Sequence, residues 1–137
     1  MYTREEKISR LSNDIASYEH FVMAGSMNSF HEHFDPFFEL VVHLDASASV
    51  RIERVNQRES KRFGERIMEG GDLYEEHKRF LDDIAGYEFG YGSTTLKEHK
   101  AWLDSIQCKV IKLDGAKPLD ENVTCIIREY KNIKNHD

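Results

Sequence analysis

The sequence has few of the features that mark secreted, membrane-spanning or metal-binding proteins. Its 137 residues include only two cysteines, Cys108 and Cys125, which form no C-x-x-C pair. Because a disulfide framework or a zinc cluster needs more cysteines at closer spacing, we expect a reduced, cytoplasmic protein. The first ten residues are too charged for a signal peptide, and no apolar run approaches the length of a membrane span. We therefore expect no membrane partner.

Positive charge is also in deficit, and two common catalytic patterns are absent. The formal net charge is −6 at pH 7, the opposite of what a broad nucleic-acid surface requires, so we expect no nucleic-acid partner. No serine or cysteine is visibly paired with a base, and the phosphate-loop pattern G-x-x-x-x-G-K-[ST] does not occur. The sequence therefore predicts no catalytic residue.

Apolar periodicity, by contrast, is clear over most of the chain. Thr3 and Glu6 form a capping box at the start of a helix expected over 3–18, and Asp72 and Glu75 are placed as a cap pair for a later helix. The other expected elements are strands over 20–26, 37–47 and 108–113, and helices from 48, over 73–87, over 93–106 and from Pro118.

This alternation of short buried strands with helices favours an α/β fold. We expect a small, mostly parallel sheet of about three strands that is flanked by helices. The length of 137 residues suits a single domain over 1–137.

The helix from residue 48 carries a stripe of positive charge, formed by Arg51, Arg54, Arg58, Arg62 and Arg66. At 100° per residue these side chains fall within about a third of the helix circumference. Arginine suits phosphate because its planar fork donates two hydrogen bonds and stays charged. The alternative is a solvated face whose arginines pair with Glu53, Glu59 and Glu65.

Three loops follow the expected strands, at 24–26, 44–47 and 113–118. Because open α/β sheets bind ligands off the carboxyl ends of their strands, these loops and the arginine stripe could together form an anion cleft. The alternative for the loop at 113–118 is an ordinary turn, which its Asp-Gly and Pro residues favour equally well.

The histidines and aromatic residues have simpler interpretations. The segment "HEHFDP" at 31–36 could form a metal corner, but a surface loop is the favoured interpretation, so we expect no metal site. Packing in or near the core is the expected role of His43, His99, Trp102, Phe80 and Tyr87.

Taken together, several segments resemble the P-loop nucleotide-kinase-like proteins, a class that includes adenylate-kinase-like and AAA-family ATPases. The matching segments are "FVMAGS", "VVHLDAS-x3-R-x2-R-x3-R", which continues into "RFGERI-x-EGGD-x-Y", and "CKVIKLDGAKP". The resemblance extends from about residue 3 to 130 and is to the C-terminal part of such proteins. It implies an incomplete P-loop kinase-like fold of three layers.

The resemblance also implies roles for individual residues. Arg54 and Arg58 correspond to arginines at the end of a helix, and Arg62 and Arg66 to arginines of a lid that contacts nucleotide phosphates. The lid-like segment is 58–72. The loop that packs against the adenine base corresponds to Asp114, Gly115, Lys117 and Pro118.

The departure from that family is large, because the glycine loop with its lysine and its magnesium-binding hydroxyl is absent from this sequence. We therefore expect a truncated or degenerate domain that transfers no phosphoryl group alone and binds a nucleotide or phosphate weakly. ATP and magnesium would serve as cofactors only if the missing glycine loop were supplied by another segment. One alternative is the C-terminal part of an active ATP-dependent nucleotide or small-molecule kinase, and another is a non-enzymatic module that associates with itself.

The absence of the family's first strand has a structural consequence. That strand would separate 20–26 from 37–44, so its loss leaves two apolar edges, which favour aggregation. We expect the strands over 20–26 and 37–44 to close the gap by pairing directly, and a homodimer to cover the remaining edges.

Overall fold

The computed structural model describes residues 1–25, 30–89 and 95–135. The chain divides into two compact units, Met1–Phe38 and Glu39–Asp137, and each is described on its own. The single domain expected over 1–137 stays a prediction.

The first unit opens with helix α1 (Arg4–Ala16), whose start the sequence predicts correctly. The Glu6 amide donates to Thr3 Oγ1 at 3.1 Å, and the Thr3 amide donates to Glu6 Oε2 at 3.0 Å. This reciprocal capping box satisfies two backbone donors that the first helical turn leaves without intrahelical partners.

The segment expected to be a surface loop at 31–36 is helical instead. It forms α2 (His31–Phe34) and a 3₁₀ turn, η1 (Asp35–Phe37). The Phe34 side chain is fully buried at 0% exposure, which explains why the segment folds onto the unit. His31 Nδ1 lies 2.9 Å from Asp35 Oδ2. Over the described residues, no three His, Cys, Asp or Glu side chains are grouped so that they could hold a metal ion.

The second unit is built on a parallel sheet of two strands, β1 (Leu40–Asp45) and β2 (Lys109–Asp114). Their register pairs Leu40 with Lys109 and Asp45 with Asp114, so both strands end at the same level. Val41 is buried at 8% exposure. The expected α/β fold with a small parallel sheet and flanking helices is confirmed.

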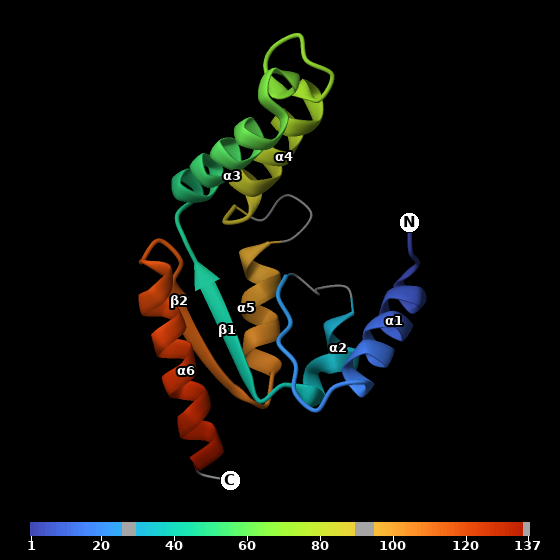
Figure 1. Ribbon diagram of the computed structural model, residues 1–137, viewed down its shortest axis with the longest axis vertical. Helices are drawn as coiled ribbons and strands as arrows, with labels where there is room; N and C mark the ends of the chain where they lie inside the picture. The colour runs from blue at the N-terminus through green and yellow to red at the C-terminus, as the bar shows by residue number, and fades with distance from the viewer. Residues whose placement is uncertain (26–29, 90–94, 136–137) are drawn as a thin grey trace. The chain divides into compact units, whose positions relative to one another are not determined.

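Helices cover the two faces of this sheet. Figure 1 shows α5 (Leu96–Ser105) and α6 (Leu119–Asn135) on either side of it. Successive strand residues point to opposite faces. Accordingly, His43 contacts His99 of α5 with ring centroids 6.0 Å apart, whereas the next residue, Leu44, lines a pocket with α6.

Helix α3 (Ala48–Phe63) follows β1, begins after Ser47 and carries four arginines of the stripe, Arg51, Arg54, Arg58 and Arg62. The expected place of Arg66 on the same helix is wrong, because α3 ends before Gly64, whose φ is +57°, and Arg66 lies in the 3₁₀ turn that follows. The Ser47 hydroxyl accepts from the Val50 amide at 3.3 Å and so caps the helix. A 3₁₀ turn, η2 (Gly64–Ile67), follows, and then the chain returns beside α3 as α4 (Tyr74–Gly86) (Figure 1). The segment 58–72 therefore forms the far end of a helical hairpin.

The turn of this hairpin is tight. The Leu73 amide donates to the Arg66 carbonyl at 2.9 Å, and a Cβ at Gly71 would collide with that same carbonyl. The expected cap pair of Asp72 and Glu75 is wrong, because α4 has no side-chain cap and the Asp72 carboxylate binds the Arg66 guanidinium instead.

The prediction of about three strands is also wrong for the described residues, where the sheet has two. Residues 20–25 have no regular secondary structure, and the last residue of the strand expected over 20–26 lies outside the described ranges. A strand persists only where a neighbouring strand binds its backbone groups. Within the described ranges β1 pairs with β2 alone, so the expected closure of the gap by pairing of 20–26 with 37–44 does not occur.

Within the three described ranges, no helix combines the length and the apolar character that a membrane crossing requires.

Candidate functional site

The carboxyl ends of β1 and β2 are bound to each other at the edge where the candidate site lies. The Gly115 amide donates to the Asp45 carbonyl at 2.7 Å, directly beyond the last paired residues. A Cβ at Gly115 would lie 3.3 Å from that same oxygen, so the close approach suits glycine. The loops after both strands therefore lie side by side, as the sequence predicts for a parallel sheet.

The loop between β2 and α6 is braced by Asp114. Its carboxylate oxygen Oδ1 accepts from the Ala116 amide at 2.8 Å, and its carbonyl accepts from the Lys117 amide at 3.1 Å. The same carbonyl accepts from Asn122 Nδ2 at 3.0 Å, and Asn122 is only 8% exposed. Asp114 is therefore engaged within the loop, and Pro118 precedes the first residue of α6.

A pocket of about 340 Å³ opens beside this loop. Its lining comes from the end of β1, from α3, from the β2–α6 loop and from α6: Leu44, Arg54, Gly115, Lys117, Leu119, Asn122, Val123 and Ile126. We call it the strand-end pocket. Four of these side chains form an apolar wall, and two are cationic.

The two cations of the strand-end pocket have no anionic partner among the described residues. Over the parts of the chain that the structure describes, neither the Arg54 guanidinium nor the Lys117 ammonium group forms an ion pair. Two unpaired positive charges beside an apolar wall produce a local positive potential in a protein of net charge −6. This arrangement can bind an anion that carries an apolar body.

The remaining predicted arginines lie outside the strand-end pocket. Arg58 Nη2 lies 3.5 Å from Glu59 Oε1, and the Arg62 guanidinium lies 5.0 Å from the centre of the Phe63 ring. Arg66 donates from Nε and Nη2 to the two Asp72 oxygens at 2.9 and 2.8 Å. The structure thus brings Arg54 together with Gly115 and Lys117, and places Arg58, Arg62 and Arg66 along the hairpin.

A second pocket of about 350 Å³ lies in this hairpin. We call it the hairpin pocket, and its lining is Glu59, Phe63, Arg66, Ile67, Leu73, Glu76, His77 and Phe80. Its charged side chains are two carboxylates and one arginine that already binds Asp72. Glu59 Oε2 is buried and has no hydrogen-bond partner among the described residues. This charge balance is unfavourable for a phosphate ligand.

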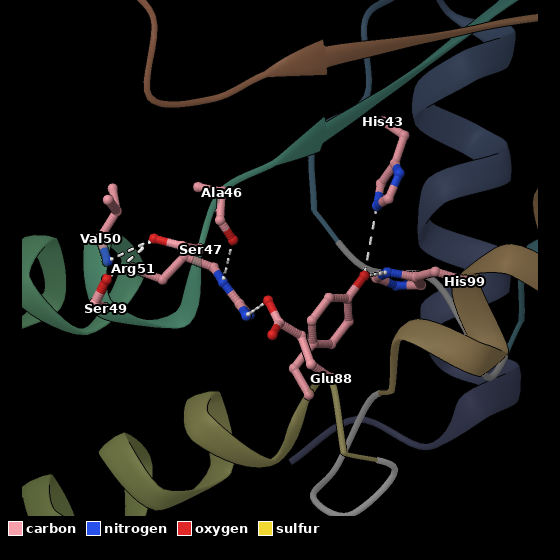
Figure 2. Close-up of polar contacts among 9 residues, drawn as sticks. His43, Ala46, Ser47, Ser49, Val50, Arg51, Glu88 and His99 are labelled. Carbon is pink, nitrogen blue, oxygen red and sulfur yellow. Dashed lines mark hydrogen bonds and ion pairs between the residues drawn. The ribbon is translucent and has the colours of Figure 1, made fainter.

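A network of titratable side chains lies on the face of β1 that points toward α5 (Figure 2). The Tyr87 hydroxyl, at the end of α4, lies 2.6 Å from His99 Nδ1 and 3.5 Å from His43 Nε2. Because one hydroxyl can donate one hydrogen bond and accept another, it can bridge the two imidazoles. The network thereby links β1, α4 and α5.

Burial governs the protonation of this network. Burial lowers the pKa of His43, an effect that nearby Asp45 opposes, and burial also lowers the pKa of His99. Burial raises the pKa of Tyr87, and the Arg51 guanidinium opposes that shift. All three side chains are therefore held in their neutral forms near neutral pH.

Arg51, the first arginine of the stripe, is part of the same region. It donates from Nε to the Ala46 carbonyl at 3.0 Å and from Nη2 to Glu88 Oε1 at 3.2 Å, and its guanidinium lies 4.7 Å from the centre of the Tyr87 ring (Figure 2). Arg51 therefore connects the β1–α3 loop to the end of α4 and is not available to a ligand.

Two features of the site were missed from the sequence. His43, Tyr87 and His99 are expected only to pack, and their mutual contacts span up to 44 residues, so no local spacing indicates the network. Asn122 was not identified either. The one sequence feature that could have indicated Asn122 is its position, four residues after Pro118 and on the same side of α6 as Ile126.

Comparison with known proteins finds one informative relative. Over 127 residues the chain is 30% identical to the uncharacterized protein YqaC of Bacillus subtilis (strain 168), and the match covers 89% of this chain and 69% of YqaC. No protein-family model matches the chain, and no solved structure matches it.

Proposed function

This chain belongs to the family of the uncharacterized protein YqaC of Bacillus subtilis, and from that premise we propose that it is a P-loop kinase-like domain that binds a nucleotide at the strand-end pocket. The phosphate groups contact Arg54 and Lys117, and the base lies against the apolar wall. Residues 1–137 alone bind the nucleotide weakly and transfer no phosphoryl group.

The observation that carries this proposal is the pair of unpaired cations at the carboxyl edge of a parallel sheet. Arg54 and Lys117 line one pocket although nearly half of the chain separates them in sequence, and no described carboxylate forms an ion pair with either. Ligands of open α/β sheets bind at this edge. The resemblance of residues 41–74 and 108–118 to nucleotide-kinase-like proteins supports the same location independently.

The side chains of the pocket suit a phosphate better than a magnesium ion. Magnesium is held by carboxylate and other oxygen ligands. The charged side chains of the strand-end pocket are cations, and the nearby Asp114 carboxylate accepts a backbone hydrogen bond. We therefore expect ATP binding that is insensitive to magnesium. A magnesium-dependent reaction would need a phosphate loop from another segment.

Titration calorimetry with ATP, with and without magnesium, tests this function. The double variant Arg54→Ala, Lys117→Ala should bind ATP at least about tenfold more weakly than the wild type, because it loses two charge-assisted hydrogen-bond donors. Arg58→Ala is the matched control. It removes an exposed arginine from the same helix, outside the pocket, and should leave the affinity nearly unchanged.

Two results would contradict the proposal in different ways. Equal ATP affinities for the wild type and the double variant would exclude the strand-end pocket as the site. Tight binding that depends on magnesium would show that the site is more complete than its side chains indicate.

A second candidate, an active kinase of which this chain is the C-terminal part, is favoured by the length of YqaC. The match covers 69% of that relative, which therefore has further residues outside it. A phosphate loop in such residues would complete the site. The measurement is ATP turnover by purified YqaC and by this chain, and turnover by YqaC alone would support this candidate.

A third candidate is self-association through α6. Four apolar side chains on this helix are exposed by 39 to 79%: Leu119, Val123, Ile127 and Tyr130. A second copy that packs its own α6 against them would bury this face. Analytical ultracentrifugation should then show a dimer that Ile127→Lys dissociates and Glu121→Lys, a charge change elsewhere on α6, does not. A wild-type monomer would exclude this candidate.

A further inference from the structure

Asn122 is a polar side chain inside an otherwise apolar part of the strand-end pocket. It is 8% exposed, and on α6 it lies among Leu119, Val123 and Ile126, which also line the pocket. A buried amide is costly unless its polar atoms find partners. Half of that requirement is met within the protein, because Nδ2 donates to the Asp114 carbonyl at 3.0 Å.

The hydrogen bond to Asp114 fixes which end of the amide faces a ligand. An asparagine amide has a donor end and an acceptor end on opposite sides of one planar group. With Nδ2 directed at the β2–α6 loop, Oδ1 is the end left for the pocket. Over the described residues, no donor reaches Oδ1. The pocket therefore presents one fixed hydrogen-bond acceptor beside its apolar wall.

The surroundings define the ligand group that this acceptor suits. Leu44 and Ile126 belong to the apolar wall, and Arg54 and Lys117 supply the positive charge. A complementary ligand combines a flat, largely apolar ring that carries an N–H donor with an anionic group. Nucleotides whose base has an exocyclic amino group present a donor at that ring position, whereas a carbonyl at the same position presents an acceptor.

We propose that Asn122 is a specificity-determining residue, whose Oδ1 accepts a hydrogen bond from the exocyclic amino group of the bound base. This inference rests on the proposed nucleotide binding and adds which bases the pocket selects. A base with a carbonyl at that position directs an acceptor at Oδ1, so two acceptors face each other beside a side chain that is only 8% exposed. Such a mismatch discriminates because the bound base covers the Asn122 oxygen and separates it from water without offering a donor in return.

Two pairs of nucleotides isolate this contact on the wild-type protein. ATP and CTP carry the amino group, whereas ITP and UTP carry a carbonyl in its place. Titration calorimetry should give a preference of about tenfold within each pair, from the loss of one buried hydrogen bond. Because phosphates and sugars are the same within a pair, the ratio reports only the contact with the base.

Two variants then assign the preference to Asn122. Asn122→Leu and Asn122→Asp both lose the Nδ2 donor to Asp114, so any loosening of the loop is common to both. Asn122→Asp keeps an acceptor oxygen in the pocket and should keep the ATP-over-ITP ratio. Asn122→Leu removes that acceptor and should bring the ratio close to one.

The outcomes separate this inference from the function it rests on. Equal binding of ATP and ITP by the wild type, or an unchanged ratio in Asn122→Leu, would overturn the role of Asn122 and leave nucleotide binding intact. If Asn122→Leu does not fold, Asn122→Ala removes the same acceptor with a smaller side chain and should likewise bring the ratio close to one. Absence of binding for all four nucleotides would overturn the proposed function itself, and this inference with it.

Discussion

The strand-end pocket and the hairpin pocket are nearly equal in volume, at about 340 and 350 Å³, and an arginine from the same helical stripe lines each. They differ in how that arginine is used. Arg54 has no ion-pair partner among the described residues, whereas Arg66 forms two hydrogen bonds with Asp72. The hairpin pocket also contains Glu59 and Glu76, which oppose an anion.

The difference shows that a count of arginines does not locate an anion site. What matters is the charge that remains after ion pairs within the protein are formed. By this criterion only Arg54 of these three arginines is left for a ligand among the described residues, while Arg51 and Arg66 hold parts of the second unit together. Substitutions in each region test this comparison.

The largest expected effect comes from Gly71→Ala in the hairpin turn. The new Cβ would collide with the Arg66 carbonyl, which accepts the Leu73 amide, so the backbone of the turn must shift. We expect the free energy of unfolding to fall by about 1–3 kcal/mol, as for other overpacked sites. Urea denaturation measures the change, and Glu69→Ala, an exposed position in the same turn, is the control.

The same variant tests whether the two regions act independently. If the strand-end pocket is the ligand site, folded Gly71→Ala should bind ATP as the wild type does. A large loss of ATP affinity would instead indicate that segment 58–72 contacts the ligand, as the resemblance to kinase lids implies.

Tyr87→Phe, in the network on the other face of β1 from the strand-end pocket, should have the next largest effect. It removes the hydroxyl that bridges His43 and His99 and leaves both half-buried imidazoles with one hydrogen bond fewer. We expect a loss of about 1 kcal/mol in the free energy of unfolding. Tyr74→Phe, which lies on α4 as well, is the control. Equal losses from both variants would mean that the network adds no stability.

A smaller effect is expected from pH. Burial lowers the pKa of both His43 and His99 in the folded protein, so near their ordinary pKa of 6.5 the unfolded chain binds protons that the folded protein does not. Stability contributed by these groups is therefore complete above pH 6.5 and is lost as the pH falls through the lower, folded-state values. Urea midpoints between pH 7.5 and 5 measure this slope, which His99→Gln should reduce. An identical slope in that variant would contradict the assignment.

The parts of this structure that could be predicted are those that depend on neighbours in sequence. The capping box at Thr3 and Glu6 forms as expected because both partners lie within one turn. Arg54, Gly115 and Lys117 meet as the strand-end rule implies, because parallel strands direct their following loops to one edge.

The wrong predictions have a different cause: each depends on a partner, present or lacking, that sequence spacing does not reveal. Asp72 was expected to cap α4 with Glu75, but Arg66, six residues earlier, offers it two charge-assisted hydrogen bonds. Residues 20–25 have an apolar composition typical of a strand, yet a strand also needs a neighbour, and composition does not supply one.

The smallest effect is expected from the Arg66–Asp72 pair, and it gives the sharpest test of the lid hypothesis. Hydrogen bonding from Arg66 lowers the pKa of Asp72, but both side chains are exposed and screened by water, so Arg66→Gln should change stability little. Asp72→Asn removes the carboxylate that holds Arg66. If segment 58–72 acts as a lid, the freed arginine should raise ATP affinity measured by calorimetry, and Arg66→Gln in the same background should reverse the gain. We expect instead that both variants stay within about twofold of the wild type, because Arg66 lies outside the strand-end pocket.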